Sequence, residues 1–265
     1  MIRDITIGQY YPAKSVLHRL DPRVKLVSTL VYLISLFLIK NIWGYLAVTL
    51  CLVAVIRLSK VPFSYIVRGL KPIILLLMIT VAFNLFLTHS GEVLFQWWIF
   101  TITEGGLQIA VLMALRLIYL IIGSSLMTFT TTPNELTDGI EALLGPLNAI
   151  HVPVHEIAMM MSIALRFIPI LLEETDKIMK AQIARGADLE SGNMIQKAKS
   201  MIPILVPLFV SAFRRANDLA MAMEARCYRG GHGRTKMKPL RYEKRDWTTY
   251  IVTVAYVVMV VIVGR

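Results

Sequence analysis

Hydrophobic residues gather into five runs along the chain, each close to the length of about 20 residues that crosses 30 Å of hydrocarbon as a helix. They cover residues 22–40, 42–60, 72–87, 105–127 and 247–263. The first two runs are separated only by Lys40 and Asn41, so a single long helix is an alternative there. The pattern predicts an all-α, polytopic membrane protein with about five transmembrane helices.

Two further apolar stretches, 157–172 and 201–213, are interrupted by charge or proline. They lie in a segment of roughly 115 residues between the fourth and fifth runs, far longer than a loop in a helical bundle. We predict partly embedded, amphipathic helices there. The expected organisation is an N-terminal membrane domain over 1–127, a cytoplasmic coupling domain over 128–246 and a C-terminal transmembrane helix over 247–265.

The start of the long segment carries clear helix boundary signals. In the sequence TPNE, Thr132 is suited to cap a helix, Pro133 to its first position and Glu135 to a capping box. Gly145 and Pro146 form the stop signal. A short helix is therefore predicted between these points.

Two longer helices follow, and both end in the same way. One begins near Val154 and ends at Ala184-Arg185-Gly186; the other carries an apolar stripe from 205 to 223 and ends at Ala225-Arg226-Cys227. Gly186 suits the left-handed residue that closes a helix. On the second of these helices, Arg214 and Asp218 lie one turn apart and are candidates to form an ion pair.

The two arginines have an ordinary structural explanation as well as a functional one. Basic residues in a last helical turn interact favourably with the negative end of the helix dipole, by about 0.3–1 kcal/mol. An exposed arginine with small neighbours also presents a planar fork that binds a carboxylate and lets a partner's backbone approach closely. One such end favours the structural explanation, whereas two on successive helices favour docking of a partner.

Basic residues orient the predicted spans. With a cytoplasmic N-terminus, the first two inner segments hold Arg3, Lys14, Arg19, Arg23 and Lys25, and then Arg57, Lys60, Arg68 and Lys71. The segment between the fourth and fifth spans adds sixteen more, whereas only Lys40 and Arg265 fall outside. Because short inner loops are enriched in lysine and arginine, the sequence predicts a cytoplasmic N-terminus.

Composition and charge narrow the function. The chain has 265 residues, 56% hydrophobic, and a net charge of +11. No nucleic-acid-binding motif accompanies this charge, so anionic lipid or an acidic protein groove explains it better than nucleic acid. Two cysteines without metal-ligand spacing, and His151 and His155 separated by Pro153, indicate neither a disulfide framework nor a metal site. No catalytic residues, cofactor or metal site are predicted.

These residues resemble the transmembrane T component of energy-coupling factor (ECF) transporters, EcfT. The resemblance covers essentially the whole chain: SVLHRLDPRVKL (15–26), RFIPIL (166–171) and the two arginine tripeptides. The family's motif is a small residue, an arginine and a small residue at the ends of two cytoplasmic coupling helices. Cys227 departs from the usual glycine or alanine but is also small.

The resemblance implies a scaffold protein rather than an enzyme. In the family, the T component joins two cytoplasmic ATP-binding-cassette (ABC) ATPases to a membrane-embedded S component that binds a vitamin or metal ion. The ATPase-coupling residues implied for this chain are Ala184, Arg185, Gly186, Ala225, Arg226 and Cys227. ATP hydrolysis is then expected in the partner chains.

The sequence is consistent with a transporter subunit that depends on partner chains for its energy. No GxxxxGK[ST] phosphate loop occurs in the sequence, and all seventeen acidic residues lie outside the five predicted spans. Ion-coupled transporters commonly carry a carboxylate within the membrane. The main alternative is a self-contained small-molecule permease or channel; a membrane-embedded enzyme and an adaptor without a transport role are the others.

A few further residues have structural explanations. Arg116 is the one ionisable side chain deep in a predicted span, where a functional role competes with a carbonyl partner in the bundle. Asp21 is expected to cap the first span beside Pro22. The Met159-Met160-Met161 run suits an adaptable surface for several S components, although methionine used as core filling is the simpler explanation.

Overall fold

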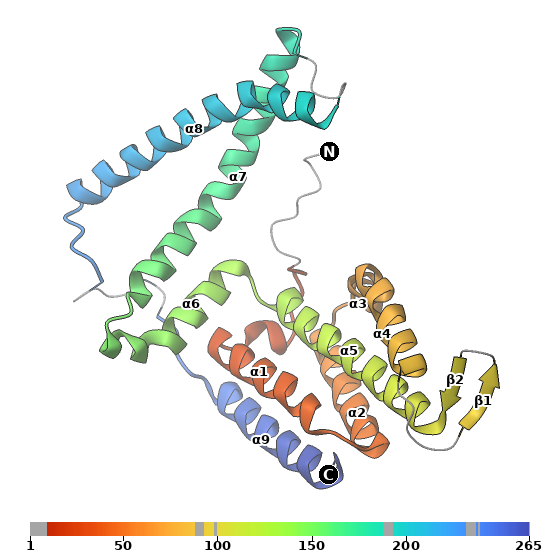
Figure 1. Ribbon diagram of the computed structural model, residues 1–265. Coiled ribbons are helices and arrows are strands. Elements are labelled where there is room, and N and C mark those ends of the chain that lie inside the picture. Colours follow the sequence, from red (N-terminus) through yellow and green to blue (C-terminus); the bar gives the residue numbers. More distant parts are fainter. Residues whose placement is uncertain are drawn as a thin grey trace. The chain divides into compact units, whose positions relative to one another are not determined.

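The computed structural model describes residues 10–87, 93–97, 100–187, 193–231, 237 and 239–264. Helices dominate this part of the chain (Figure 1), as the sequence predicts. Arg3, Arg234, Lys236, Lys238 and Arg265, which the orientation argument uses, lie outside the described residues. The chain divides into two compact units, one of Gly8–Ala142 with Leu240–Arg265 and one that contains Leu143–Pro239.

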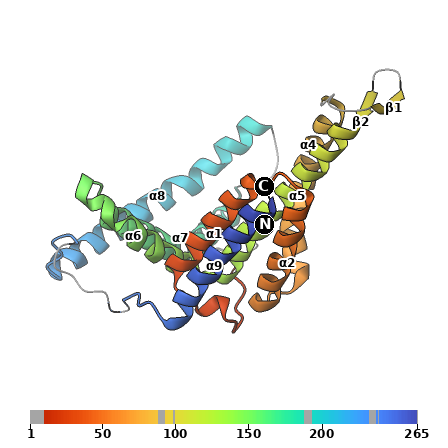
Figure 2. The ribbon, with the colours of Figure 1, turned by 90° about the horizontal axis from the view of Figure 1, so that it is seen from below.

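The first unit, here called the bundle unit, holds all five predicted spans. Its helices are α1 (Pro22–Leu38), α2 (Ile42–Ser59), α3 (Phe63–Leu70), α4 (Ile74–Leu87), α5 (Glu104–Thr130), α9 (Lys244–Gly264) and most of α6 (Pro133–Leu144), with short 3-10 turns at Leu17–Arg19 (η2) and Lys71–Ile73 (η3). α9 packs against both α1 and α2, and α5 packs against α1 to α4 (Figure 2). The C-terminal helix therefore completes a bundle begun by the first helices of the chain.

The core of the bundle unit lies between α1, α2, α5 and α9. Its buried side chains are Leu36, Ile39, Tyr45, Val48, Leu52, Val61, Ile66, Tyr119, Ile122, Leu126, Phe129 and Val260. Tyrosine hydroxyls in this core find partners: the Tyr32 hydroxyl donates to the Tyr119 carbonyl at 3.1 Å, and Ser35 bonds the Tyr256 hydroxyl at 2.9 Å. Many other apolar side chains of these helices are exposed, as expected of helices that face lipid.

Glycine permits the closest helix contacts in this unit. A Cβ on Gly44 would lie 2.9 Å from the Cα of Gly264, so α2 and the end of α9 approach backbone to backbone there. A Cβ on Gly123 would overlap the Tyr32 ring. Small residues at such crossings are typical of helices that associate in membranes.

Among the described residues, five helices are long and apolar enough to cross a membrane, as many as the sequence predicts, but they are not the same five. Ile42–Ser59, Glu104–Thr130 and Lys244–Gly264 match predicted spans, while the other two are Val154–Ala184 and Ile195–Ala225. The predicted first span is α1, a separate helix of 17 residues that ends before Asn41, so the single-helix alternative is wrong. The predicted third span is α4, which follows α3 through a bend of 59°.

The segment between α4 and α5, which falls between the predicted third and fourth spans, contains a short hairpin. Val93–Trp97 (β1) and Phe100–Thr103 (β2) pair antiparallel, with Trp97 opposite Phe100 and Val93 opposite Thr103. Thr103 then caps α5, because its hydroxyl accepts from the Gly106 amide at 3.2 Å. The small hairpin leaves the all-α architecture unchanged.

The predicted caps are confirmed. Thr132 and Glu135 form a capping box at α6, with bonds of 3.1 and 3.3 Å, and α6 ends at Leu144 before Gly145. Asp21 caps α1 by accepting from the Arg23 amide at 2.9 Å and also pairs with the Arg23 guanidinium at 2.9 Å.

Buried charges also join the helix ends on this side of the bundle. Asp246, only 1% exposed, accepts from the Asp21 amide at 2.9 Å, and the Lys25 ammonium donates to the Thr130 carbonyl at 2.9 Å. Because Thr130 is the last residue of α5, Lys25 satisfies a carbonyl that the helix itself leaves free.

Arg116 has the carbonyl partner expected of a structural arginine. Its guanidinium donates to the carbonyl of Ile39 at 3.2 Å and to the hydroxyl of Tyr45 at 3.1 Å, and it lies 5.5 Å from the Phe37 ring. Ile39 is the residue that follows the last turn of α1. Arg116 therefore ties α5 to the ends of α1 and α2 through a helix-terminal carbonyl.

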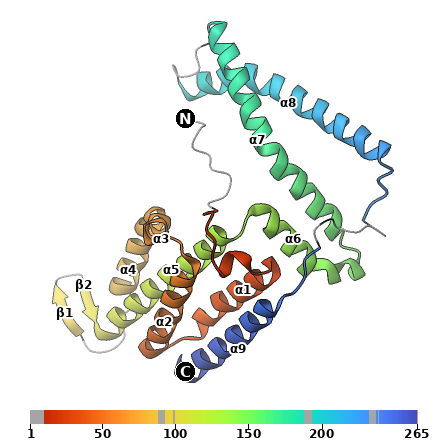
Figure 3. The ribbon, with the colours of Figure 1, turned by 180° about the vertical axis from the view of Figure 1, so that it is seen from behind.

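The second unit, here called the long-helix unit, contains α7 (Val154–Ala184) and α8 (Met194–Ala225), preceded by the 3-10 turn η4 (Gly145–Ile150). Both long helices were predicted, and both run through their prolines without a break: Pro169 lies within α7, and Pro203 and Pro207 lie within α8. Figure 3 shows the two helices crossing near the end of α7. They are the elements that carry the predicted functional residues.

Candidate functional site

The end of α7 is built by local hydrogen bonds around Arg185. The Gly186 amide donates to the Ile183 carbonyl at 2.9 Å, and the Ala187 amide to the Gln182 carbonyl at 3.0 Å. Gly186 has φ +87°, so it is the left-handed residue of a Schellman motif, as the sequence predicted. Arg185 is the last residue before this reversal.

The end of α8 repeats this arrangement residue for residue. The Cys227 amide donates to the Glu224 carbonyl at 2.8 Å, and the Tyr228 amide to the Met223 carbonyl at 3.0 Å. Cys227 is in the left-handed region with φ 54°, the conformation that Gly186 adopts on α7. Arg226 therefore occupies the same position on α8 that Arg185 occupies on α7.

The arginines and their small neighbours are open to solvent. Ala184, Arg185, Gly186, Ala225, Arg226 and Cys227 are all exposed. Among the described ion pairs, neither Arg185 nor Arg226 takes part. A Cβ on Gly186 would meet no atom within 4 Å, so the surrounding space is open and only the backbone angle favours glycine there.

A side chain that the sequence analysis did not single out fixes the crossing of α7 and α8. The Gln182 amide donates to the Pro203 carbonyl at 3.2 Å. That carbonyl would ordinarily accept from the amide four residues later, but residue 207 is proline and has none. Gln182 thus supplies the hydrogen bond that Pro207 removes.

An ion pair also joins the two helices. Arg215 on α8 binds Glu174 on α7, with 2.9 Å between guanidinium nitrogen and carboxylate oxygen. Among the described ion pairs of α8, this one takes the place of the predicted Arg214–Asp218 pair. Arg215 therefore binds α7 rather than an acidic residue of its own helix.

The ends of α7 and α8 that carry Arg185 and Arg226, here called the arginine tips, lie apart in the structure. Arg185 lies three residues beyond Gln182, close to the crossing, whereas Arg226 follows Pro203 by 23 residues. At about 1.5 Å per residue this places Arg226 roughly 35 Å along α8 from the crossing. Figure 1 shows the far end of α8 projecting away from α7. The two tips are suited to bind at two separate places.

Apolar side chains without partners cover much of α7 and α8. Met160, Met161 and Ile168 on α7 are exposed, as are Leu205, Val206, Phe209, Val210 and Phe213 on α8. Exposed apolar surface of this extent on two neighbouring helices marks contact with lipid or another membrane protein. Among the described residues, no three His, Cys, Asp or Glu side chains lie together in a way that could hold a metal ion.

The helices and their two ends define a multi-pass helical membrane protein that presents paired, arginine-capped tips. A family model described as "Cobalt transport protein" (CbiQ) matches residues 13–237. An energy-coupling factor transporter transmembrane protein, EcfT, of Clostridium kluyveri is 60% identical over 248 residues, covering 93% of this chain and 92% of its own.

Other relatives with the same name are similar over nearly their whole length. The EcfT protein of Ruminiclostridium cellulolyticum is 54% identical over 99% of this chain and 98% of its own length. That of Bacillus subtilis is 49% identical over 95% of each chain. The chain therefore belongs to the CbiQ family and, within it, to the EcfT transmembrane components of energy-coupling factor transporters.

Proposed function

We propose that this protein joins two ABC-type ATPases to a membrane-embedded, substrate-binding S component, in an importer for a vitamin or another micronutrient. It is a non-catalytic subunit, and ATP is hydrolysed by the partner chains. It lies in the bacterial cell membrane with its N-terminus in the cytoplasm, and the expected division at 1–127, 128–246 and 247–265 separates membrane from coupling segments.

One observation carries this proposal: α7 and α8 end in the same Schellman motif with an exposed arginine at the same position. Capping alone stabilises a helix end without an exposed arginine. The presence of an exposed arginine at both ends therefore favours a binding role. The separation of roughly 35 Å along α8 supports one tip for each of two ATPase subunits.

The chemistry of docking follows from the two tips. An arginine fork binds a carboxylate through two parallel hydrogen bonds, and hydrogen bonds to charged groups contribute about 1.5–3 kcal/mol each. The flanking Ala184, Gly186, Ala225 and Cys227 add little bulk, which lets the tip enter a groove. Acidic residues in a groove of each ATPase are the expected partners.

The crossing of α7 and α8 supplies a way to transmit movement. Gln182 joins the helices near the first tip, and the Glu174–Arg215 pair joins them again 12 residues further along α8, beyond which α8 extends as a lever. When the ATPases approach one another, displacement of the tips changes the angle between the helices. The exposed apolar side chains of α7 and α8 are then placed to pass this change to the S component within the lipid.

Charge reversal at both tips tests the proposal. Arg185→Glu with Arg226→Glu should abolish co-purification of the ATPases and substrate uptake, while the protein still inserts into the membrane. The matched control is Lys177→Glu with Arg214→Glu, which makes the same charge change at exposed positions along the same two helices. Uptake and ATPase recovery at the wild-type level in the tip variant would refute the docking role.

A reconstitution separates this function from that of a self-contained permease or channel. The purified chain alone in liposomes should transport nothing, and uptake should require both the ATPases and an S component. Transport by the chain alone would favour the permease.

A further inference from the structure

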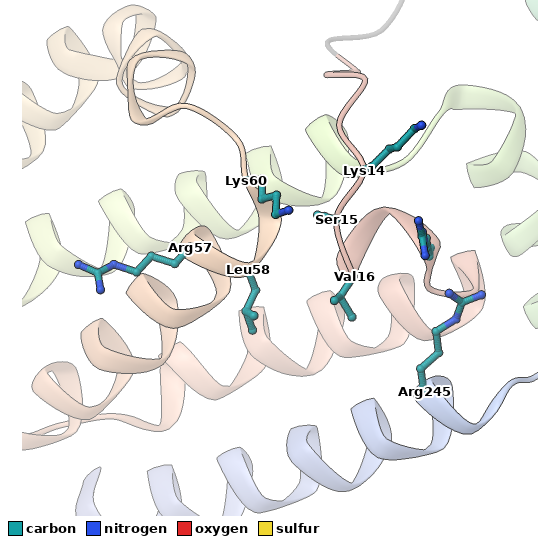
Figure 4. Close-up of a pocket in the computed structure, with 8 residues that line it drawn as sticks. Lys14, Ser15, Val16, Arg57, Leu58, Lys60 and Arg245 are labelled. Atoms are coloured by element: carbon teal, nitrogen blue, oxygen red, sulfur yellow. The ribbon is translucent and has the colours of Figure 1, made fainter.

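A basic hollow of about 390 Å³ lies in the bundle unit, and none of the tip residues lines it. Five cationic side chains line it: Lys14, Arg19, Arg57, Lys60 and Arg245. They come from three separate parts of the chain, namely the segment before α1, the end of α2 and the start of α9 (Figure 4). The fold therefore gathers charges that the sequence places more than two hundred residues apart.

The hollow lies at one end of the bundle, beside the start of α1, the end of α2 and the start of α9. α1 begins at Pro22, α2 ends at Ser59 and α9 begins at Lys244, so the lining residues all lie at one end of these helices. If α2 and α9 cross the hydrocarbon, this end lies at the depth of the lipid phosphates. The positive-inside rule assigns it to the cytoplasmic leaflet, where anionic lipids produce a negative surface.

The charges in the hollow are poorly balanced by the protein. No acidic residue is among those that line it. Arg245 pairs with Glu243 at 2.8 Å, but that carboxylate is on the exposed side chain of a neighbouring residue. The Nε of Arg245 is buried without a hydrogen-bond partner among the described atoms. The lining cations as a group favour an anionic ligand from outside the chain.

Two apolar side chains complete the surface. Val16 and Leu58 line the same hollow and remain 57% and 55% exposed. In Figure 4, Lys60 and Arg245 extend on either side of Val16, whereas Arg57 is directed to the far side of α2. Cationic groups beside exposed aliphatic groups match a ligand that has an anionic head and a hydrocarbon tail.

We propose that this hollow binds the phosphate group of an anionic phospholipid such as phosphatidylglycerol. Lys14, Arg19, Lys60 and Arg245 bind the phosphate oxygens, and Val16 and Leu58 contact the glycerol and upper acyl chain. The bound lipid would link α2 to α9 and to the segment before α1, where the chain's own cations otherwise repel one another. A free phosphate offers the same oxygens without the tail.

Binding to the purified full chain tests the proposal. Native mass spectrometry in mild detergent measures the affinity for short-chain phosphatidylglycerol, short-chain phosphatidylcholine, glycerol 3-phosphate and inorganic phosphate. Each basic residue near a membrane surface contributes about a fivefold factor in affinity for anionic lipid. Lys14→Gln with Lys60→Gln should therefore weaken phosphatidylglycerol binding roughly 25-fold, with little change for phosphatidylcholine.

A second pair of lysines provides the control. Lys40→Gln with Lys71→Gln removes the same charge from exposed lysines outside the hollow, and should change phosphatidylglycerol affinity less than twofold. Both double variants should melt like the wild-type protein without lipid, because all four side chains are exposed. Equal losses in the two variants would overturn the site. Inorganic phosphate that binds as tightly as phosphatidylglycerol would overturn the lipid assignment and leave a free-phosphate site.

Discussion

At the scale of single residues, the two helix ends differ in one informative way. α7 uses glycine in the left-handed position and α8 uses cysteine, although a side chain in that conformation costs about 1–2 kcal/mol. Cys227→Gly should remove this cost and slow hydrogen exchange of the Tyr228 amide, which donates the closing bond, by about fivefold or more. Hydrogen exchange resolved at single amides measures this directly.

Two substitutions control that experiment. Cys227→Ala removes the thiol but keeps the backbone cost, so exchange of the Tyr228 amide should stay near the wild-type rate. Gly186→Ala should have the opposite effect on α7, because it introduces the same cost and speeds exchange of the Ala187 amide. Slower exchange in Cys227→Ala would mean that the thiol, rather than the backbone angle, sets the stability of this end.

The residues of the tips could be predicted from the sequence because helix-end chemistry is local. Arginine followed by glycine or a small residue indicates a capped end within five residues. Gln182 could not be found in this way, since its partner is a carbonyl 21 residues away whose need arises from Pro207. The Glu174–Arg215 pair was missed for the same reason, because only the crossing of α7 and α8 brings the two side chains together.

At the scale of elements, the Gln182 bond leads to a prediction about the crossing. Gln182→Leu leaves the Pro203 carbonyl without its donor and should weaken the α7–α8 contact by about 1 kcal/mol. Spin labels on cysteines placed at Lys180 and Lys197, in a background with Cys51 and Cys227 changed to serine, should then show a broader distribution of distances. Gln182→Lys keeps an N–H donor and should retain the narrow distribution; if it broadens equally, the donor is not what fixes the crossing.

Glycine at the α2–α9 contact gives a second prediction at this scale. Gly44→Ala would place a Cβ 2.9 Å from the Gly264 backbone, and such overpacking typically costs about 1–3 kcal/mol. The midpoint of thermal unfolding in detergent should fall by roughly 2–4 °C for each kcal/mol. Gly69→Ala is the matched control, because its Cβ would meet only Ser125 Oγ at 3.5 Å; a fall of equal size there would exclude the proposed steric cause.

The elements themselves were predictable where a hydrophobic run was long and bounded by caps. α2, α5 and α9 follow such runs, whereas the interrupted apolar stretches of α7 and α8 predicted only partly embedded helices; Thr132 with Glu135 correctly indicated the start of α6. The β1–β2 hairpin was missed because strands of four and five residues give a weak periodic signal beside long helices. The apolar run of the predicted third span gave no indication of the bend between α3 and α4, since hydropathy reports length and not direction.

At the scale of the whole molecule, the proposed mechanism requires one membrane orientation, which the distribution of charge predicts. Both arginine tips must face the compartment that contains the ATPases, which the basic inner segments assign to the cytoplasm. The cation-lined hollow at the ends of α2 and α9 belongs to the same side under this orientation. We therefore expect tips, hollow and N-terminus all to face the cytoplasm, and a measurement of orientation tests this.

Cys227 is a native probe for that measurement, because it is exposed and follows Arg226 directly. With the chain expressed without its partners and Cys51 changed to serine, a membrane-impermeant maleimide should label Cys227 in inverted vesicles but not in intact cells. A cysteine placed at Lys40, which belongs to the opposite end of α1, should react in intact cells instead in a Cys227→Ser background. Labelling of Cys227 in intact cells would reverse the orientation and place the tips where no cytoplasmic ATPase can reach them. Labelling of Cys227 in inverted vesicles, and of the cysteine at position 40 in intact cells, would place α8 where nucleotide-driven movement of the ATPases can act on it.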